Sequence, residues 1–197
     1  MEKLDKLYFA SSSDHKKREM QRLIKTGIGI VLPKHLGLEF SPDENGSSFI
    51  ENALIKAKAL YDIVKAPVLA DDSGLVVDAL DGRPGIYTAR YGCSDTVKLT
   101  SRQQYTLLLK EMEGKENRSA RFVSACVLML DRERIYIVQE TVEGSIATEA
   151  EGENGFGYDP VFLVEDTGRS AAQLSDSEKD RYSHRGRAMR KINLLLS

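Results

Sequence analysis

Two adjacent carboxylates are the feature of the sequence most suggestive of chemistry. Asp71 and Asp72 are followed by Ser73 and Gly74, with apolar runs on either side. Carboxylate oxygens are the ligands that Mg²⁺ prefers, and a carboxylate can also accept a proton as a general base. The alternative is an ordinary surface turn, because Asp, Ser and Gly are turn-forming residues. The segment alone leaves both interpretations open.

A hydroxyl-rich segment near the N-terminus is a candidate phosphate site. It consists of Ser11, Ser12, Ser13, Asp14, His15 and Lys16. A strand, a polar turn and a helix in this order present hydroxyls, backbone N–H groups and a lysine to an anion. The segment is not a Walker A loop, because the Gly-Lys-Ser/Thr ending is absent. A plain Ser or Asp helix cap explains the same residues, and on this segment alone it is the preferred interpretation.

Further charged residues lie within or just before a strongly periodic apolar segment at 49–64. At about 100° per residue, Lys56 falls roughly 20° outside the apolar stripe of the predicted helix. It either reaches solvent or points into a cleft. Glu51 forms a capping-box pattern with Ser48 and is interpreted as structural. Glu44, in the preceding loop, has no such structural role.

Two later segments could recognise a flat or anionic ligand. Glycines flanking Phe156 let the backbone approach a planar group while the ring stacks on it. Ser183, His184 and Arg185 open a basic C-terminal helix, where Ser183 is a good helix cap. Arg185 there either binds an anion or a carbonyl oxygen, or only caps the helix or pairs with a nearby carboxylate.

The elements that must position these residues follow from apolar periodicity and turn residues. Helices are predicted at about 16–25, 49–64, 101–113 (with Ser101 as its cap) and 184–196. Strands are predicted at about 7–10, 28–32, 67–70, 75–77, 122–130, 135–142 and 161–164, with a loop at 33–47. Mixed strands and helices with at least one hairpin predict an α/β fold with a mixed sheet. No linker divides the 197 residues.

Composition and charge exclude several classes of protein. Apolar residues at 41% and charged residues at 29% are globular values. A net charge of −2 argues against binding nucleic acid by bulk positive charge. The apolar run 122–130 is too short for a membrane span. The N-terminus has no signal-peptide pattern and Cys126 lies in an apolar run, so we expect a cytoplasmic protein.

The distribution of charge is more informative than its sum. Residues 139–159 contain six carboxylates and no Lys or Arg, whereas residues 179–191 contain six Lys or Arg and one Asp. Such segments suit an anionic ligand that carries a divalent metal, although solvated faces are the preferred explanation of charge runs taken alone. A phosphate-binding module without turnover and a nucleic-acid-binding protein remain alternatives. Glu44 and Asp72 weigh against the first, and the acidic tracts against the second.

The order of five motifs resembles the inosine/xanthosine triphosphate pyrophosphatase family over nearly the whole chain. The motifs are Phe49-Ile50-Glu51-Asn52-Ala53 with Lys56, Ala70-Asp71-Asp72-Ser73-Gly74, Arg83-Pro84-Gly85-Ile86-Tyr87 with Ala89-Arg90-Tyr91, Gly155-Phe156-Gly157-Tyr158-Asp159-Pro160 and Ser183-His184-Arg185-Gly186. Ser12 and Ser13 stand where the family's phosphate loop has Gly and Asn.

The resemblance implies a single domain over 1–197 with an elongated, two-lobed α/β fold. In such a fold a long twisted mixed β-sheet is flanked by helices and a cleft lies between the lobes. It also implies a homodimer that uses Mg²⁺ to convert noncanonical purine nucleoside triphosphates (ITP, dITP, XTP) to the monophosphate and pyrophosphate. Neither nucleic acid nor a membrane is an expected partner.

The resemblance also implies roles for individual residues. Glu44 and Asp72 would hold the metal, and Asp72, with Asp71 beside it, would take a proton from the attacking water. The residues implied to bind substrate are Ser11, Ser12, Ser13, Asp14, His15, Lys16, Lys56, Ser73, Phe156, Gly157, Tyr158, Asp159, Lys179, Ser183, His184 and Arg185. Among these, Lys179, His184 and Arg185 would read the purine edge while Phe156 stacks on the base.

Overall fold

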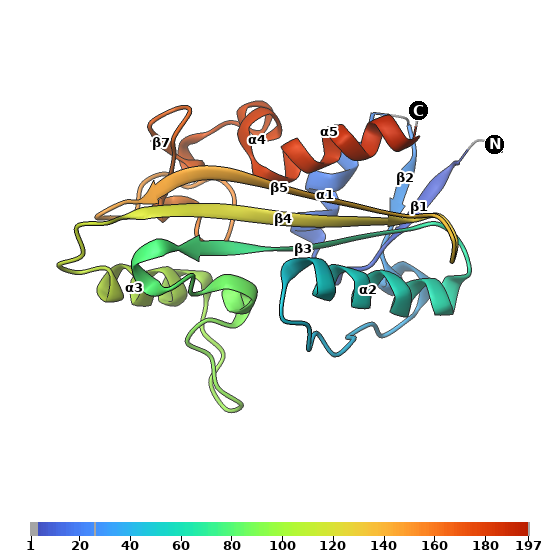
Figure 1. Ribbon diagram of the computed structural model, residues 1–197, viewed down its shortest axis with the longest axis horizontal. Coiled ribbons are helices and arrows are strands. Elements are labelled where there is room, and N and C mark those ends of the chain that lie inside the picture. The colour runs from blue at the N-terminus through green and yellow to red at the C-terminus, as the bar shows by residue number, and fades with distance from the viewer. Residues whose placement is uncertain (1–3, 26, 197) are drawn as a thin grey trace. The chain divides into compact units, whose positions relative to one another are not determined.

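The fold is a mixed β-sheet flanked by helices, seen in a computed structural model that describes residues 4–25 and 27–196 (Figure 1). The helices are α1 (Asp14–Leu23), α2 (Phe49–Val64), α3 (Ser101–Glu111), α4 (Asp176–Tyr182) and α5 (His184–Leu196). The strands are β1 (Lys6–Phe9), β2 (Gly29–Val31), β3 (Val68–Val77), β4 (Ser119–Met129), β5 (Ile135–Ile146), β6 (Phe162–Val164) and β7 (Arg169–Ser170).

The sheet has seven strands in the order β2-β1-β3-β4-β5-β6-β7. Strand β1 pairs in parallel with β2 and with β3, where Tyr8 lies opposite Val68. Strand β6 pairs antiparallel with β5 and with β7. The predicted mixed α/β sheet is therefore confirmed.

The chain divides into two compact units. Unit 1 contains residues 1–72, 124–140 and 185–197, and unit 2 contains residues 73–123 and 141–184. Each unit has its own hydrophobic core. The divisions at 72/73, 123/124 and 140/141 fall inside β3, β4 and β5.

In unit 1, helices cover both faces of the strands. Buried side chains of α1 and α5, among them Met20 and Met189, share one core with Phe9 and Leu128 of the strands. Figure 1 shows α2 on the opposite side of β3 from α5. A strand between two helical layers has no solvated face, which explains the unbroken burial of β3 from Val68 to Asp72.

In unit 2, the core gathers around β4 and β6. The Phe122 and Phe162 rings lie 4.6 Å apart, centroid to centroid, and are tilted by 59°, a favourable aromatic geometry. Leu108 and Met112, at the C-terminal end of α3, pack into the same core.

The turn predicted at residues 71–74 is wrong, because β3 runs without a break from Val68 to Val77. Asp71 and Asp72 therefore lie inside a strand. The turn preference of Asp, Ser and Gly is local, and here it is outweighed by pairing with neighbouring strands and by partners for both carboxylates (below).

Other boundaries are corrected by their caps. Helix α1 begins at Asp14 because Ser13 accepts a hydrogen bond from the Lys16 N–H. Helix α3 begins at Ser101, but its cap is Thr100 rather than Ser101. The predicted loop at 33–47 contains a 3₁₀ turn at Pro33–Leu36, and helix α4 and strand β7 were not predicted. The predicted helices 49–64 and 184–196 are confirmed.

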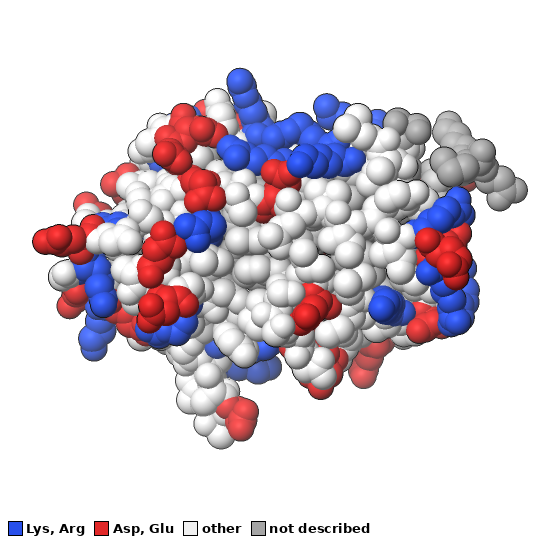
Figure 2. All heavy atoms as spheres, viewed as in Figure 1, with Lys and Arg blue, Asp and Glu red and all other residues white. Residues whose placement is uncertain are grey.

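Charge is mixed on the face drawn in Figure 2, with Lys and Arg gathered where α5 lies in Figure 1. Lys191 of α5 pairs with Glu140 of β5. Within the part of the chain that the structure describes, no helix is both long and apolar enough to cross a membrane.

Candidate functional site

Strand geometry gives Asp71 and Asp72 different surroundings. Successive side chains of a strand point to opposite faces, so Asp71 faces the side of α1 and α5 and Asp72 faces the side of α2 (Figure 1). Their exposed fractions are only 1% and 8%. Buried carboxylates need partners, and the partners of the two residues decide what each can do.

Asp71 is the counter-ion of two cations. Its Oδ2 lies 2.7 Å from Lys16 Nζ and 3.3 Å from Arg185 Nε, and its Oδ1 accepts a 2.7 Å hydrogen bond from the Ser124 hydroxyl. Burial by itself raises the pKa of Asp71, but Lys16 and Arg185 outweigh it and hold that pKa well below its usual range. The charged form of Asp71 is therefore favoured, and this carboxylate is a poor proton acceptor.

Arg185 joins this cluster through a second carboxylate. Its Nη1 lies 3.1 Å from Glu19 Oε2 of α1, and both side chains are buried. The pairing with nearby carboxylates that the sequence offered as an alternative is thus present. Whether Arg185 also reads a purine stays a prediction.

Asp72 has one engaged oxygen and one that lacks a partner. Its Oδ1 accepts a 2.6 Å hydrogen bond from Lys56 Nζ. Its Oδ2 is buried and finds no hydrogen-bond partner among the described residues. Burial raises the pKa of Asp72 in spite of the nearby Lys56, so this carboxylate is the better proton acceptor of the pair.

Lys56 also contacts Glu44, at 3.1 Å. The sequence left open whether Lys56 reaches solvent or a cleft, and the structure buries it, with an exposed fraction of 7%. Burial by itself lowers the pKa of Lys56, but Asp72 and Glu44 raise it above its usual value. The lysine is therefore charged. It brings together the carboxylates of Glu44, from the loop before α2, and Asp72, from β3.

The loop that carries Glu44 is fixed to the start of α2. The Gly46 N–H donates to Asn52 Oδ1 at 2.9 Å, and Ser47 donates to Glu51. A Cβ at Gly46 would lie 2.7 Å from the Asn52 side chain, so the close approach requires glycine. Glu51 is structural, as predicted, although its carboxylate binds Ser47 rather than Ser48.

The donor set suits a divalent cation. No group of three His, Cys, Asp or Glu side chains gathers as a preformed metal cage among the described residues. Yet the carboxylates of Glu44 and Asp72, including the Asp72 Oδ2 that has no partner in the described part of the chain, supply hard oxygen ligands near each other. This is the donor type of Mg²⁺ sites, which commonly use one or two carboxylates plus substrate phosphates.

In the 11–16 segment, several side chains bind local partners. Ser11 accepts from the Ser13 N–H, Ser13 caps α1, and Asp14 pairs with Lys34 at 2.5 Å. Lys34 holds the pKa of the exposed Asp14 below its usual value. His15 Nδ1 lies 3.0 Å from Arg18. Lys16 reaches the carboxylate cluster, where it pairs with Asp71.

A second cluster forms within unit 2 around the Gly-rich segment. Asp159 Oδ2 accepts from the Phe156 N–H at 2.8 Å and from Lys179 Nζ at 2.7 Å. Lys179 Nζ lies 5.8 Å from the centroid of the Phe156 ring. His184 stacks on Phe122, with centroids 4.9 Å apart.

Two predicted site residues have structural surroundings. Tyr158 belongs to the core of unit 2 and donates to the Thr88 carbonyl. Ser183 ends α4, and its N–H donates to the Lys179 carbonyl.

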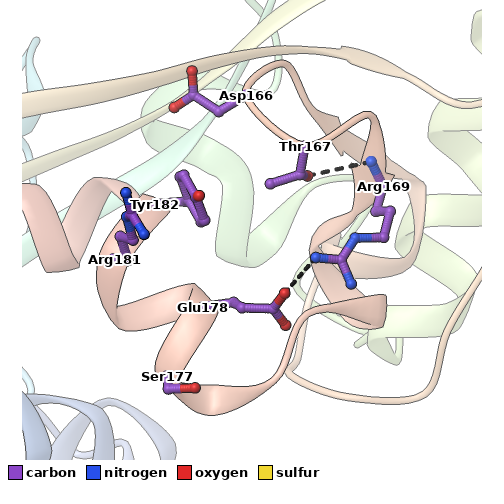
Figure 3. Close-up of a pocket in the computed structure, with 7 residues that line it drawn as sticks. All are labelled: Asp166, Thr167, Arg169, Ser177, Glu178, Arg181 and Tyr182. Carbon is purple, nitrogen blue, oxygen red and sulfur yellow. Dashed lines mark hydrogen bonds and ion pairs between the residues drawn. The ribbon is translucent and has the colours of Figure 1, made fainter.

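A pocket of about 560 Å³ lies elsewhere in unit 2 (Figure 3). Its lining residues are Asp166, Thr167, Arg169, Ser177, Glu178, Arg181 and Tyr182. None of them is a predicted site residue. Arg169 and Glu178 pair with each other across it.

Two residues of the carboxylate cluster were missed at the level of sequence. Glu19 follows Lys16 by three residues, on the same helical face. Ser124 is a polar residue inside a long apolar run, and that interruption is the signal that could have identified it. Their partners lie 166 and 53 residues away in the chain, which no local pattern reveals.

The sequence and the fold agree with one family of proteins. The model of the Ham1 family matches residues 7–194, and the chain belongs to that family. A dITP/XTP pyrophosphatase of Treponema denticola is 52% identical over 188 residues, covering 95% of this chain and 96% of that protein. One of Bacillus licheniformis is 40% identical over 197 residues, covering 98% of each chain.

Solved structures agree with the fold. The Ham1 protein of Staphylococcus aureus superposes with a TM-score of 0.85 at 34% identity, covering 97% of each chain. A HAM1 protein from Coxiella burnetii gives a TM-score of 0.87 at 35% identity, covering 97% of this chain and 98% of that one. The resemblance drawn from the five motifs is confirmed.

Proposed function

We propose that this chain hydrolyses noncanonical purine nucleoside triphosphates (ITP, dITP and XTP) to the nucleoside monophosphate and pyrophosphate. Relatives at 40–52% identity are named dITP/XTP pyrophosphatases. The observation that carries the mechanism is the contrast between Asp71 and Asp72: one carboxylate saturated by cations, and its neighbour with a buried oxygen that has no partner among the described residues.

Asp72 is the general base in this proposal. Water attacks the α-phosphorus, its proton passes to the Asp72 carboxylate, and the bond to the bridging oxygen between the α- and β-phosphates breaks. A raised pKa suits this step, because a base works best when its pKa is close to the operating pH. Asp71 remains ionised and holds Lys16 and Arg185 in place.

Lys16 and Lys56 balance the charge on the triphosphate. Catalysis of phosphoryl transfer is mainly positioning and charge stabilisation, and both ammonium groups lie within the carboxylate cluster. Glu44 and Asp72 would hold Mg²⁺, which when bound neutralises charge on the phosphates. Ser73, directly after Asp72, and the hydroxyls of residues 11–13 complete the phosphate contacts.

The second cluster recognises the base. Phe156, with an exposed fraction of 36%, stacks on the purine beside Gly157. Lys179 and His184 donate to the 6-keto oxygen that hypoxanthine and xanthine carry and adenine lacks, and the resemblance to the family adds Arg185 as a third donor. Lys179 and Arg185 carry donors only, so they favour that oxygen and disfavour an amino group.

Assembly and location rest on the resemblance to the family. We propose a homodimer in the cytoplasm. Sedimentation velocity over a range of protein concentrations tests the homodimer, and a species of monomer mass at all concentrations would contradict it.

The direct test is hydrolysis of ITP with a coupled inorganic pyrophosphatase, in the presence and absence of Mg²⁺. We expect Mg²⁺-dependent release of pyrophosphate from ITP, dITP and XTP, and slow release from ATP. Nucleotide binding without turnover would instead identify a regulatory module. Tighter binding to nucleic acid than to nucleotides would identify a nucleic-acid-binding protein.

A further inference from the structure

One oxygen atom in unit 2 holds two separate parts of the base-recognition cluster. Asp159 Oδ2 accepts both the Phe156 backbone N–H, at 2.8 Å, and the Lys179 ammonium, at 2.7 Å. Asp159 and Lys179 have exposed fractions of 7% and 9%. Charge-assisted hydrogen bonds in a buried setting are strong and directional. This atom therefore fixes both the Phe156 backbone N–H and the Lys179 ammonium.

Gly155 makes the arrangement possible. Its φ of +80° is strained for any L side chain, and an added Cβ would lie 2.1 Å from Asp159 Oδ2 and 2.6 Å from Lys179 Nζ. Both distances are below van der Waals contact. The glycine therefore reserves space for the ion pair as well as permitting the turn.

The Phe156 ring and the Lys179 ammonium lie near each other. Phe156 is about one-third exposed although its backbone N–H is fixed, and Lys179 Nζ lies 5.8 Å from the ring centroid. A planar ligand on that ring would meet a lysine whose charge is already balanced. The carboxylate itself is almost fully covered and accepts two donors on one oxygen.

We propose that Asp159 is a positioning residue for substrate recognition, which acts through Phe156 and Lys179 rather than by touching the purine. The inference rests on the proposed function, because the ligand it positions these groups for is the purine base. It gives Gly155 a second role, as the residue that keeps the anchor in place.

The test is a double-mutant cycle. We compare Asp159→Asn in the wild-type chain with the same change in a Phe156→Leu/Lys179→Gln background. Asparagine keeps the shape and one acceptor for the Phe156 N–H, but it loses the charge that holds Lys179. Glu153→Gln is the matched control, because it removes one carboxylate from an exposed position of the same loop.

In the wild-type background we expect Asp159→Asn to raise KM for ITP by about tenfold or more, with kcat changed less than about threefold, because ground-state placement of the base is lost. In the double-mutant background the same change should alter KM less than about threefold, because its partners are gone. Gly155→Ala should reproduce the Asp159→Asn effect, and Glu153→Gln should leave KM unchanged.

Calorimetric binding of inosine monophosphate repeats the cycle without turnover. An equal effect of Asp159→Asn in both backgrounds, in either assay, would overturn the positioning role and point to direct contact with the base. If the wild-type chain binds the monophosphate but does not hydrolyse ITP, the proposed function fails while the binding cycle still decides this inference. If the wild-type chain hydrolyses ITP but does not bind the monophosphate, the proposed function stands and the KM cycle decides this inference. A wild-type chain that neither hydrolyses ITP nor binds the monophosphate overturns both.

Discussion

At the scale of single residues, the proposed chemistry depends on the different partners of two neighbouring carboxylates. Asp71 accepts from Lys16, Arg185 and Ser124, whereas Asp72 accepts from Lys56 through one oxygen only. Partners lower a carboxyl pKa and burial without them raises it. In the proposed function their identical side chains therefore have separate roles, and the sequence could not say which of the two would take the proton.

Asp72→Asn tests the base directly. It removes the proton acceptor and a metal-ligand charge together, and loss of general base catalysis alone costs about 10²–10⁴-fold in rate. We expect kcat for ITP to fall by at least that factor while the chain remains folded by circular dichroism, because Lys56 keeps Glu44 as a partner. Asp95→Asn, at an exposed position, is the control. A variant that keeps more than about a tenth of the wild-type kcat would remove Asp72 from this role.

Arg185→Ala separates two roles for the same side chain. Its removal leaves Asp71 and Glu19 buried with a cation missing, and breaking a buried ion pair costs about 3–5 kcal/mol. We expect the free energy of unfolding, from urea denaturation, to fall by about that amount, whereas Arg190→Ala at an exposed position of α5 should have little effect.

The same variant tests base recognition. If Arg185 also donates to the 6-keto oxygen, kcat/KM for ITP should fall at least about tenfold and the preference for ITP over ATP should collapse. Arg185→Lys retains the charge and serves where the alanine variant is too unstable to assay. Lower stability with an unchanged ITP/ATP ratio would leave Arg185 as an anchor of Asp71 and end its assignment to the base.

At the scale of elements, the strongest local signals predicted structure best. Helix α2 was predicted with its observed ends, because its apolar stripe and its Ser48 cap agree. Strand β3 was broken in the prediction at Asp71–Gly74. The groups that stabilise its two carboxylates come from α1, α2, β4 and α5, and no window around residue 71 contains them.

The loop before α2 offers a prediction at this scale. Asn52 is 1% exposed and fixes Gly46, two residues after Glu44. We expect Asn52→Ala to loosen Glu44 and to weaken the apparent affinity for Mg²⁺ about 10- to 100-fold, as loss of a supporting hydrogen bond does at other metal sites. Titration with Mn²⁺, followed by electron paramagnetic resonance, measures this without turnover.

Asn45→Ala is the matched control for this experiment. It lies in the same loop at an exposed position and should leave metal affinity unchanged. If Asn52→Ala and Asn45→Ala bind the metal equally well, the loop is not positioned through Asn52.

At the scale of the whole molecule, local sequence patterns predicted the class of fold but not where it divides, although the resemblance to the family implied two lobes. Two hydrophobic cores exist, one in each unit, although no linker or shift in composition separates them. The reason is physical: the divisions lie inside β3, β4 and β5, where the chain has strand character on both sides. The five motifs, in contrast, identified the family because their order extends over nearly the whole chain.

Hydrolysis of ITP in ¹⁸O-labelled water, with products followed by ³¹P NMR and mass spectrometry, tests the central claim most directly. Attack of water on the α-phosphorus predicts inosine monophosphate and pyrophosphate in equal amounts, with the label only in the monophosphate. Label in pyrophosphate would contradict the proposed point of attack. Inosine diphosphate with free phosphate as the products, or no hydrolysis of ITP, would contradict the proposed activity itself.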